Sequence, residues 1–387
     1  MPGRIVLYGA TGYIGGLTAR AMVAAGTRPV LAGRNRDRLA ALAARLSQEG
    51  GGAKLETAVA GGAAGPEGLR ELIGAGDVLV STAGPFVKVG RPVVEAAVDA
   101  GAIYLDSSGE PPFIRQVFEE FGPRAARTGA VLLTAFGYDY VPGNLAGALA
   151  LQAAGPAAAR VRVGYFVQGD IRKGTSAGTR ASVAGVLLAP GYAYRGGRIV
   201  TERTAAHVAS FEIDGTRRRG FSIGSSEHFA LPRLRPPAAG ADDIPAPAPL
   251  TDVGVYLGWL DGATWLAHYG SAAVAPLERL PPARRVLDEV ARRIQRSRAG
   301  PRQGESIRSD VVAAAADARG RKLASVRLTG GDPYSFTAPM LAWAARKAAA
   351  GGVQPTGALG PVEAFGAGSL ESGCAAAGFH RQHAEPG

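Results

Sequence analysis

A glycine-spaced turn near the start of the sequence constrains the fold more than any other feature. The seven residues of this turn are Gly9, Ala10, Thr11, Gly12, Tyr13, Ile14 and Gly15. A short strand-like run, Arg4–Tyr8, precedes the turn, and a segment of helical character, Ile14–Ala25, follows it. Glycines at this spacing let the backbone approach a pyrophosphate, whose oxygens bind the free amide groups of the helix. We therefore predict a dinucleotide-binding turn in which all seven residues line the cofactor.

Short apolar runs alternate with helical patterns over the N-terminal part of the chain. The predicted strands are Arg4–Tyr8, Pro29–Gly33, Lys54–Val59, Asp77–Thr82, Ala102–Asp106 and Ala130–Ala135. Helical patterns such as Asp37–Leu46 and Val93–Ala100 lie between them. Continuous apolar runs suit strands that are buried on both faces, and intervening helices imply right-handed crossovers. We therefore predict an α/β fold with a Rossmann doubly wound parallel sheet, which binds its ligand at the carboxyl ends of the strands.

The pattern changes after residue 145, where the strand patterns become longer. They lie at Arg160–Gln168, Ala206–Ile213, Arg217–Ile223, Asp252–Trp259, Asp310–Ala316 and Lys322–Thr329. The dipeptide Asp214-Gly215 is typical of a hairpin turn between two of them. These patterns predict a second, α+β domain with a mostly antiparallel sheet. An exposed loop is expected at Pro232–Leu250 and a surface helix at Pro282–Ser297.

Helical patterns return from Ser335 onward, at Pro339–Ala350 and Gly368–Ala377. The predicted division of the chain is a cofactor-binding Rossmann domain at 1–145, a substrate or dimerisation domain at 146–333, and C-terminal helices at 334–387. A sheet in the second domain could pair two copies of the chain, so a homodimer is one expectation.

The end of the second predicted strand indicates which dinucleotide is bound. Enzymes that use NAD usually carry Asp or Glu there, whereas this chain has Arg34 followed by Asn35. A guanidinium suits the 2′-phosphate of NADP, which an acid would repel. Arg36 or Arg38 could assist, and Asp37 sits where a helix N-cap is expected. We predict NADP(H) as the cofactor, with Arg34 and Asn35 in contact with it; the alternative is a solvated arginine in an arginine-rich chain.

Three further predicted strands end at the same edge of the sheet, in segments 81–86, 106–110 and 136–144. In this fold the nicotinamide end of the cofactor reaches that region. These segments add four predicted cofactor-binding residues, Ala83, Gly84, Pro85 and Ser108.

A hydride transfer also needs a group that supplies or takes a proton. The candidates at this edge are Lys88, Asp106, Glu110, Tyr138, Asp139 and Tyr140. We favour Tyr140 or Tyr138, because a phenol with a pKa of about 10 is a good donor to a developing anion. Asp139 is the third catalytic candidate, since a carboxyl must be buried to stay protonated at neutral pH. The structural alternatives are that Asp106 and Asp139 cap turns and that both tyrosines fill the core.

Composition argues against several function classes. The net charge is +11, but the arginines are scattered and no basic stripe interleaves with aromatic residues, so nucleic-acid binding is not expected. The single cysteine, Cys374, excludes an internal disulfide, and no metal is expected because the histidines are dispersed. No apolar window is long enough to span a membrane and no secretory signal opens the chain, so we expect a soluble, cytoplasmic protein.

Several segments together resemble the saccharopine dehydrogenase-like oxidoreductases, and within that group the bacterial trans-acting enoyl reductase branch. The segments are Gly9–Gly15, Ala32–Arg34, Thr82–Phe86, Tyr104–Asp106, Gly109-Glu110, Gly137–Pro142, Gly330–Tyr334 and Thr337-Ala338. The resemblance implies a Rossmann domain, NADP(H) and a second domain whose sheet covers the substrate cleft. It also implies that the helices of 334–387 pack back on the first domain.

The resemblance implies an activity as well. Members of the group reduce carbon–carbon double bonds of polyketide or lipid chains, or form or cleave carbon–nitrogen bonds. We expect an NADPH-dependent reductase of an activated C=C (enoyl-type) or C=N bond in a small or acyl-chain metabolite of secondary metabolism. One alternative is a saccharopine-type amine or amino-acid dehydrogenase, with Arg172, Lys173 and Arg180 available for substrate carboxylates. Another is a non-catalytic dinucleotide-binding protein.

Two positions depart from the pattern of the group. The branch often has an acid just after the third strand, where this chain has Ala60-Gly61-Gly62. The small residue that usually follows a Gly-Phe-Asp motif is Tyr140 here. The first departure touches the adenine side of the cofactor and the second alters the expected active site. The apolar segment Thr179–Tyr194 could line a tunnel for an acyl chain, rest on a membrane surface, or be an ordinary core helix.

Overall fold

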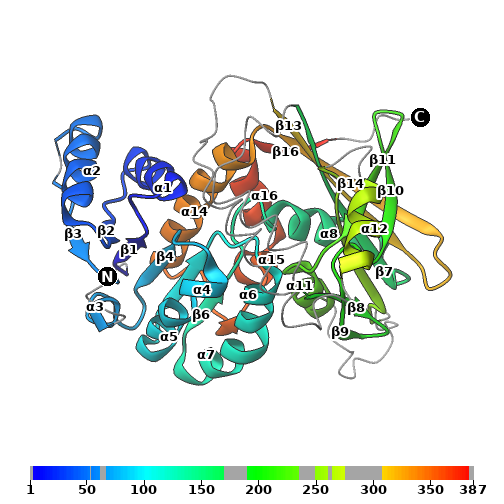
Figure 1. Cartoon of the computed structure of the whole chain (residues 1–387), viewed down its shortest axis with the longest axis horizontal. Helices are drawn as coiled ribbons and strands as arrows, with labels where there is room; N and C mark the ends of the chain where they lie inside the picture. Colours follow the sequence, from blue (N-terminus) through cyan, green and yellow to red (C-terminus); the bar gives the residue numbers. More distant parts are fainter. Residues whose placement is uncertain are drawn as a thin grey trace. The chain divides into compact units, whose positions relative to one another are not determined.

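The chain forms two compact units in the computed structural model (Figure 1). The first unit comprises residues 1–109, 113–141 and 333–378, and the second comprises 110–112, 142–332 and 379–387. The structure describes residues 3–52, 54–61, 67–169, 190–234, 249–259, 264–274 and 307–382. The expected surface helix at Pro282–Ser297, most of the segment Thr179–Tyr194 and most of the expected loop Pro232–Leu250 lie outside these residues.

The first unit is built around a seven-stranded sheet with the order β15-β6-β5-β4-β1-β2-β3. All neighbouring strands in it are parallel. The strands are β1 (Ile5–Tyr8), β2 (Val30–Gly33), β3 (Thr57–Val59), β4 (Val78–Ser81), β5 (Ile103–Asp106), β6 (Val131–Leu133) and β15 (Gly357–Ala358). The first six lie inside the ranges predicted from sequence, which confirms the Rossmann sheet. The chain order reverses direction between β1 and β4, where such a sheet binds its ligand.

Apolar strands and amphipathic helices explain why this sheet forms. Every residue of β1, β2, β4 and β5 is buried, as expected for strands that are covered on both faces. The helices of the unit are α1 (Tyr13–Ala24), α2 (Arg36–Glu49), α3 (Glu67–Arg70), α4 (Phe86–Val89), α5 (Arg91–Ala100), α6 (Pro111–Gln116), the π-helix η2 (Val117–Phe121), α7 (Gly122–Thr128), α14 (Pro333–Ala349), α15 (Pro361–Phe365) and α16 (Ala367–Ala376). Helix α14, orange in Figure 1, packs against α1 and against β1, β4 and β5.

The second unit contains a nine-stranded sheet. Its strands are β7 (Arg160–Gln168), β8 (Pro190–Arg195), β9 (Arg198–Arg203), β10 (Val208–Ile213), β11 (Thr216–Ser222), β12 (Asp252–Leu257), β13 (Arg308–Ala316), β14 (Lys322–Gly330) and β16 (Phe379–Gln382). The main path runs β10-β11-β12-β7-β13-β14-β16, and the β8–β9 hairpin pairs with β12. Only β12 and β7 run parallel in the described part of this sheet, which confirms the mostly antiparallel prediction. Helices α8 (Val141–Ala154), α11 (Glu227–Arg233) and α12 (Thr264–Val274) complete the unit.

The C-terminal segment differs from its prediction. Helices α14 to α16 belong to the first unit, but the chain returns at Phe379 to pair with β14, so the segment 334–387 is not helical throughout. Phe379 is 1% exposed and packs directly over Gly330, where a Cβ atom would lie 2.1 Å from the phenyl ring. Burial of the Phe379 ring against Gly330 stabilises β16. The sequence did not indicate this strand, because a single Phe among polar residues gives no hydrophobic periodicity.

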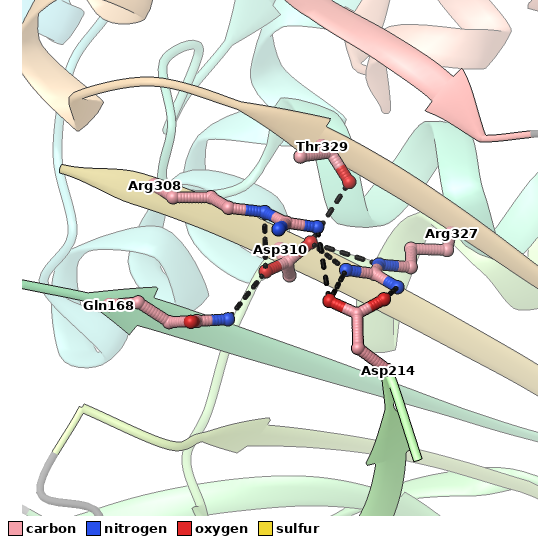
Figure 2. Close-up of polar contacts among 6 residues, drawn as sticks. All are labelled: Gln168, Asp214, Arg308, Asp310, Arg327 and Thr329. Carbon is pink, nitrogen blue, oxygen red and sulfur yellow. Dashed lines mark hydrogen bonds and ion pairs between the residues drawn. The ribbon is translucent and has the colours of Figure 1, made fainter. Parts of the chain in front are cut away.

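A buried carboxylate, Asp310 on β13, holds together one face of the second sheet (Figure 2). Its Oδ1 accepts hydrogen bonds from Arg327 Nε at 2.9 Å and Thr329 Oγ1 at 2.9 Å. Its Oδ2 accepts one from Gln168 Nε2 at 3.0 Å. Strands β7, β13 and β14 are therefore joined by side chains as well as by their backbone ladders.

The same arginine connects this face to a distant hairpin. Asp214, in the turn between β10 and β11, accepts from Arg327 Nη2 at 2.9 Å and from Arg308 Nη2 at 3.2 Å. The hydrogen bond from Arg327 holds the pKa of Asp214 below its ordinary value. Three other strands separate β11 from β14 in the sheet, so the contact requires the sheet to curl. Phe166 and Phe211, with ring centroids 5.4 Å apart, fill the concave side.

We predict that Asp310→Ala destabilises the folded protein by about 3 kcal/mol, because Arg327 Nε, the Thr329 hydroxyl and the Gln168 amide lose the buried acceptor that they share. Denaturant unfolding followed by circular dichroism measures the loss. The matched control is Glu56→Ala, which removes only the exposed ion pair with Arg4 and should leave the free energy of unfolding nearly unchanged. Equal stability of Asp310→Ala and the wild type would contradict the role of this carboxylate.

Candidate functional site

The predicted glycine-spaced turn joins β1 to α1 in the first unit. Gly9 has a φ of +82°, and its N–H donates to the Ala32 carbonyl at 3.0 Å. Gly12 N–H donates back to the Gly9 carbonyl at 2.9 Å, which closes the turn. A Cβ atom on Gly15 would lie 2.2 Å from the same carbonyl oxygen, so only glycine allows α1 to approach the strand end this closely. The backbone geometry thus requires glycine at two of the three positions, Gly9 and Gly15.

The start of α1 fits a phosphate group. The helix is twelve residues long, no side chain caps its N-terminus at Gly12, and no acid lies in its first turn. Ala10 is buried beneath the turn, Thr11 and Ile14 are half-buried, and Tyr13 is 43% exposed. The positive end of the helix dipole and its backbone amides therefore face an open position without a competing protein anion.

The end of β2 carries the cations predicted to bind the 2′-phosphate. Arg34 is exposed and has no hydrogen bond or ion pair within the described residues. Asn35 caps α2, with its Oδ1 accepting from Arg38 N–H at 2.9 Å. Arg38 Nη2 also donates to the Thr11 carbonyl at 3.2 Å, which ties the second strand end to the phosphate turn. Arg34 is left available for a ligand.

The expected position of Asp37 as the N-cap of this helix is wrong. The helix begins at Arg36, so Asp37 lies inside its first turn and Asn35 is the cap. An Asn amide oxygen reaches the backbone N–H three residues on, which satisfies a donor that the helix itself leaves open. Asp37 instead lies near the positive end of the helix dipole, where a carboxylate is favourable.

The loop after β4 lies directly against the phosphate turn. Thr82 Oγ1 donates to the Tyr8 carbonyl at 3.1 Å and approaches the Gly9 carbonyl at 3.2 Å. A Cβ atom on Gly9 would lie 2.9 Å from the Ala83 nitrogen. The predicted residues Ala83, Gly84 and Pro85 therefore lie beside the turn, and Pro85 is the N-cap of α4. The Gly84–Pro85 peptide bond is cis.

Asp106 ties the loops after β5 and β6 together. Its Oδ1 accepts from Ser108 N–H at 2.7 Å and from Ala135 N–H at 2.9 Å. The side chain is fully buried, and burial raises its pKa to about 6 against the opposing effect of these two backbone donors. Of the two roles considered from sequence, proton transfer and turn capping, the geometry matches the capping role. The predicted cofactor residue Ser108 is held in place by this bond.

Three other buried polar groups surround Asp106, namely Ser81, Tyr104 and Thr134. Ser81 and Asp106 are register partners on β4 and β5. The side-chain oxygens approach one another, but none of the three hydroxyls makes a well-directed hydrogen bond. Burial, and secondarily the charge of Asp106, raises the pKa of Tyr104 well above its ordinary value. The row is thus a poorly hydrated polar layer beneath the carboxyl edge of the sheet.

The two tyrosines favoured as proton donors lie in the interior. Tyr138 and Tyr140 are each 2% exposed. Tyr138 N–H donates to Thr337 Oγ1 at 3.1 Å, and Tyr140 N–H donates to the Ala135 carbonyl at 2.9 Å. These contacts fix the backbone of the loop after β6 and bury both rings, which matches the structural alternative.

Asp139, between the two tyrosines, has a different environment. Its side chain is enclosed on most sides, but the residue retains some exposure. The carboxylate has no hydrogen-bond or ion-pair partner within the described residues, and burial raises its pKa to about 6. A Cβ atom on Gly109 would lie 2.7 Å from Asp139 Oδ2, so the glycine after β5 makes room for this carboxyl. The Asp139–Tyr140 peptide bond is cis.

The remaining proton candidates are placed elsewhere. Lys88 is exposed on α4, and Glu110 is buried at a position assigned to the second unit. Arg172, Lys173 and Arg180 lie outside the described residues.

Two residues of this edge, Thr337 and Tyr8, were not among the site residues predicted from the sequence. The Thr337 hydroxyl on α14 accepts from the loop after β6, and the Tyr8 ring lies at the carboxyl end of β1. Tyr334, at the start of α14, also contacts Tyr13 edge-to-face with ring centroids 5.3 Å apart. The only available signal for α14 was the Gly330–Tyr334 and Thr337-Ala338 segments of the family resemblance.

The described residues contain neither a metal-ligand cluster nor a helix that could span a membrane. No group of three or more His, Cys, Asp or Glu side chains there is arranged to hold a metal ion. No helix among the same residues is long and apolar enough to cross a membrane.

Residues 5–133 match the family described as saccharopine dehydrogenase NADP binding domain. The match covers the strands, the glycine-spaced turn and Arg34, and it confirms the family resemblance and the prediction of NADP(H) as the cofactor.

Curated relatives are similar to part of the chain. A Mycobacterium tuberculosis protein named as a trans-acting enoyl reductase is 37% identical over 186 residues, 47% of this chain and 44% of that protein. The trans-acting enoyl reductase of Mycobacterium leprae is 38% identical over 143 residues, 36% of this chain and 34% of that protein. The matched part thus spans less than half the length of these relatives.

Solved structures resemble the chain over more of its length but at low similarity. An amine dehydrogenase from Mycobacterium smegmatis is 13% identical, covering 92% of this chain and 94% of that one, with a TM-score of 0.43. A variant of meso-dapdh from Clostridium tetani is 13% identical over 93% of this chain and 94% of that one, with a TM-score of 0.42.

We predict that Gly15→Ala abolishes NADPH binding, because its methyl group would push α1 away from the Gly9 carbonyl and open the turn. Gly16→Ala is the matched control: its nearest neighbour would be the Ala10 carbonyl at 3.9 Å, so the turn is undisturbed. The control should bind NADPH normally and gain up to about 1 kcal/mol of helix stability. Calorimetric titration of both variants tests this, and normal binding by Gly15→Ala would contradict the predicted packing.

Proposed function

We propose that this chain is an NADPH-dependent reductase and that it saturates the carbon–carbon double bond of an enoyl group. The observation that carries the proposal is Asp139, a carboxyl without a protein partner in the described residues at the same sheet edge as the glycine-spaced turn. The names of the mycobacterial relatives, which match less than half of this chain, support the enoyl substrate class.

The residues of the turn fit NADPH. The α1 terminus and the backbone from Gly9 to Gly15 would hold the pyrophosphate, and Arg34 would bind the 2′-phosphate. When bound, NADPH supplies a hydride, one hydrogen with two electrons, to the β-carbon of the enoyl group and leaves as NADP⁺. Ala83 to Pro85 and Ser108 border the region expected for the nicotinamide.

Asp139 supplies the proton that completes the reduction. Hydride addition at the β-carbon leaves an electron pair shared by the α-carbon and the carbonyl oxygen, and the Asp139 carboxyl donates a proton to the α-carbon. One hydride and one proton then saturate the bond. The resulting carboxylate recovers its proton from solvent, to which the residue is partly open. Burial raises its pKa to about 6, so the acid form persists closer to neutrality than for an exposed Asp.

The buried tyrosines have a supporting role in this proposal. Tyr138 and Tyr140 fix the loop from both sides of Asp139, through Thr337 and Ala135. Asp106 holds the neighbouring loop that carries Gly109. The position of the proton donor therefore depends on packing and backbone hydrogen bonds rather than on side chains that react.

The substrate class is tested with NADPH and three probes of stated chemistry: a crotonyl thioester of N-acetylcysteamine, cyclohexenone and 2-methyl-1-pyrroline. The proposal expects saturation of the thioester, with the reduced product identified by mass spectrometry. Turnover of the cyclic imine alone would replace enoyl reduction with C=N chemistry of the amine dehydrogenase type. Tight NADPH binding without turnover of any probe would favour the non-catalytic alternative. A cytoplasmic location and a homodimer stay predictions.

We predict that Asp139→Asn lowers kcat by about a hundredfold or more while the Kd for NADPH stays unchanged, since the amide cannot donate the proton. In the wild type, kcat should be constant below about pH 6 and fall about tenfold per pH unit above it, because the acid form is the active one. Asp99→Asn, on the exposed face of α5, is the control and should match the wild type. A flat pH profile or an active Asn variant would remove Asp139 from this role.

The same raised pKa predicts a stability effect. A carboxyl whose folded pKa lies above its ordinary 3.8 stabilises the fold at low pH and loses that contribution as pH rises to about 6. The unfolding temperature of the wild type should therefore fall relative to Asp139→Asn between these two values and run parallel to it at higher pH. Because Asp106 is present in both proteins, its own titration cancels in the comparison. A constant difference would show that Asp139 is not buried as described.

A further inference from the structure

Tyr8 places a phenol at the adenosine side of the carboxyl edge. It is the last residue of β1, paired with Ala32 on β2, and it is 8% exposed. Its hydroxyl reaches the loop after β3, where a Cβ atom on Gly61 would lie 2.4 Å from the phenolic oxygen. The ring therefore extends past the end of β2, beneath the position where Arg34 leaves the sheet.

The Tyr8 hydroxyl is available to a ligand. It makes no hydrogen bond in the described part of the chain, although hydroxyls so close to the interior normally have a partner. Burial raises the pKa of the phenol, and the guanidinium of Arg34 acts in the opposite direction, which places the two groups near each other. The phenol therefore stays protonated at neutral pH and can donate.

The surroundings of this hydroxyl favour an anion. Ala60 and Gly61, the residues just after β3, present no carboxylate to it. Gly61, with a φ of +77°, leaves the space that the Tyr8 hydroxyl occupies. Arg34 follows Ala32, the β2 partner of Tyr8, by two residues, and its guanidinium opposes the rise in the pKa of the phenol, whereas Asp37 lies in the first turn of α2. A neutral donor beside an unpaired guanidinium is suited to a phosphate rather than to a ribose hydroxyl alone.

We propose that the Tyr8 hydroxyl donates a hydrogen bond to the 2′-phosphate of NADP(H) and, together with Arg34, determines the preference for NADP over NAD. This inference rests on the proposed use of NADPH. It assigns to a strand residue, outside the glycine-spaced turn and the arginine loop, a direct part in cofactor specificity.

Calorimetric binding of two adenosine fragments to the full chain tests the inference. The fragments are 2′,5′-ADP, which carries the 2′-phosphate, and 5′-AMP, which lacks it. Tyr8→Phe should weaken 2′,5′-ADP by about tenfold and leave 5′-AMP unchanged, as expected for loss of one hydrogen bond to a charged group. The Phe variant keeps the ring and loses no hydrogen bond to the described residues, so it should fold as the wild type, which circular dichroism checks. Tyr104→Phe, which removes a buried hydroxyl from β5, is the matched control and should bind both fragments normally.

The outcomes distinguish the assignment of Tyr8 to the 2′-phosphate from the use of NADPH itself. Equal weakening of both fragments would place the hydroxyl against the adenosine and overturn the assignment to the 2′-phosphate. Unchanged binding of both would reduce Tyr8 to a packing role. A wild type that binds 2′,5′-ADP no more tightly than 5′-AMP would instead contradict the use of NADPH itself.

Discussion

The close approach of α1 to the end of β1 is the constraint on which the cofactor site depends. A side chain at Gly15 would meet the Gly9 carbonyl at 2.2 Å, so the absence of a single methyl group sets the distance between helix and strand. That distance brings an uncapped helix terminus to the switch point of the sheet. The loop after β4 then rests on Gly9, and Arg38 in the first turn of α2 donates to the Thr11 carbonyl.

A second constraint organises the other half of the edge. Asp106 uses one carboxylate oxygen to hold the loops after β5 and β6, and it is buried with few other partners. Those two loops carry Gly109 and Asp139, whose close contact leaves the second carboxyl partly enclosed and unpaired in the described residues. Two carboxyls with similarly raised pKa values thus differ in surroundings, because Asp106 accepts from two backbone donors through Oδ1 and Asp139 accepts from none of the described residues.

Much of this edge could be predicted from sequence because its determinants are local. The glycine spacing, the apolar strands and the cation after β2 each form a pattern within a few residues, and the parallel sheet confirmed the strands. The roles of Tyr138, Asp139 and Tyr140 could not be separated in this way. Which of three adjacent side chains stays open depends on Thr337, 199 residues from Tyr138, and on a glycine after another strand. The pairing of the Phe379 strand with the second sheet likewise depends on tertiary packing, and no local hydrophobic pattern indicates it.

The most direct test of the account is calorimetric titration of the wild type and Arg34→Ala with NADPH and with NADH. Arg34 is exposed and unpaired in the described residues, so its removal should cost the fold little. The account predicts that the wild type binds NADPH at least about tenfold more tightly than NADH and that Arg34→Ala removes about that preference while NADH binding stays the same. Equal affinity of the wild type for both nucleotides, or an unchanged preference in the variant, would contradict it.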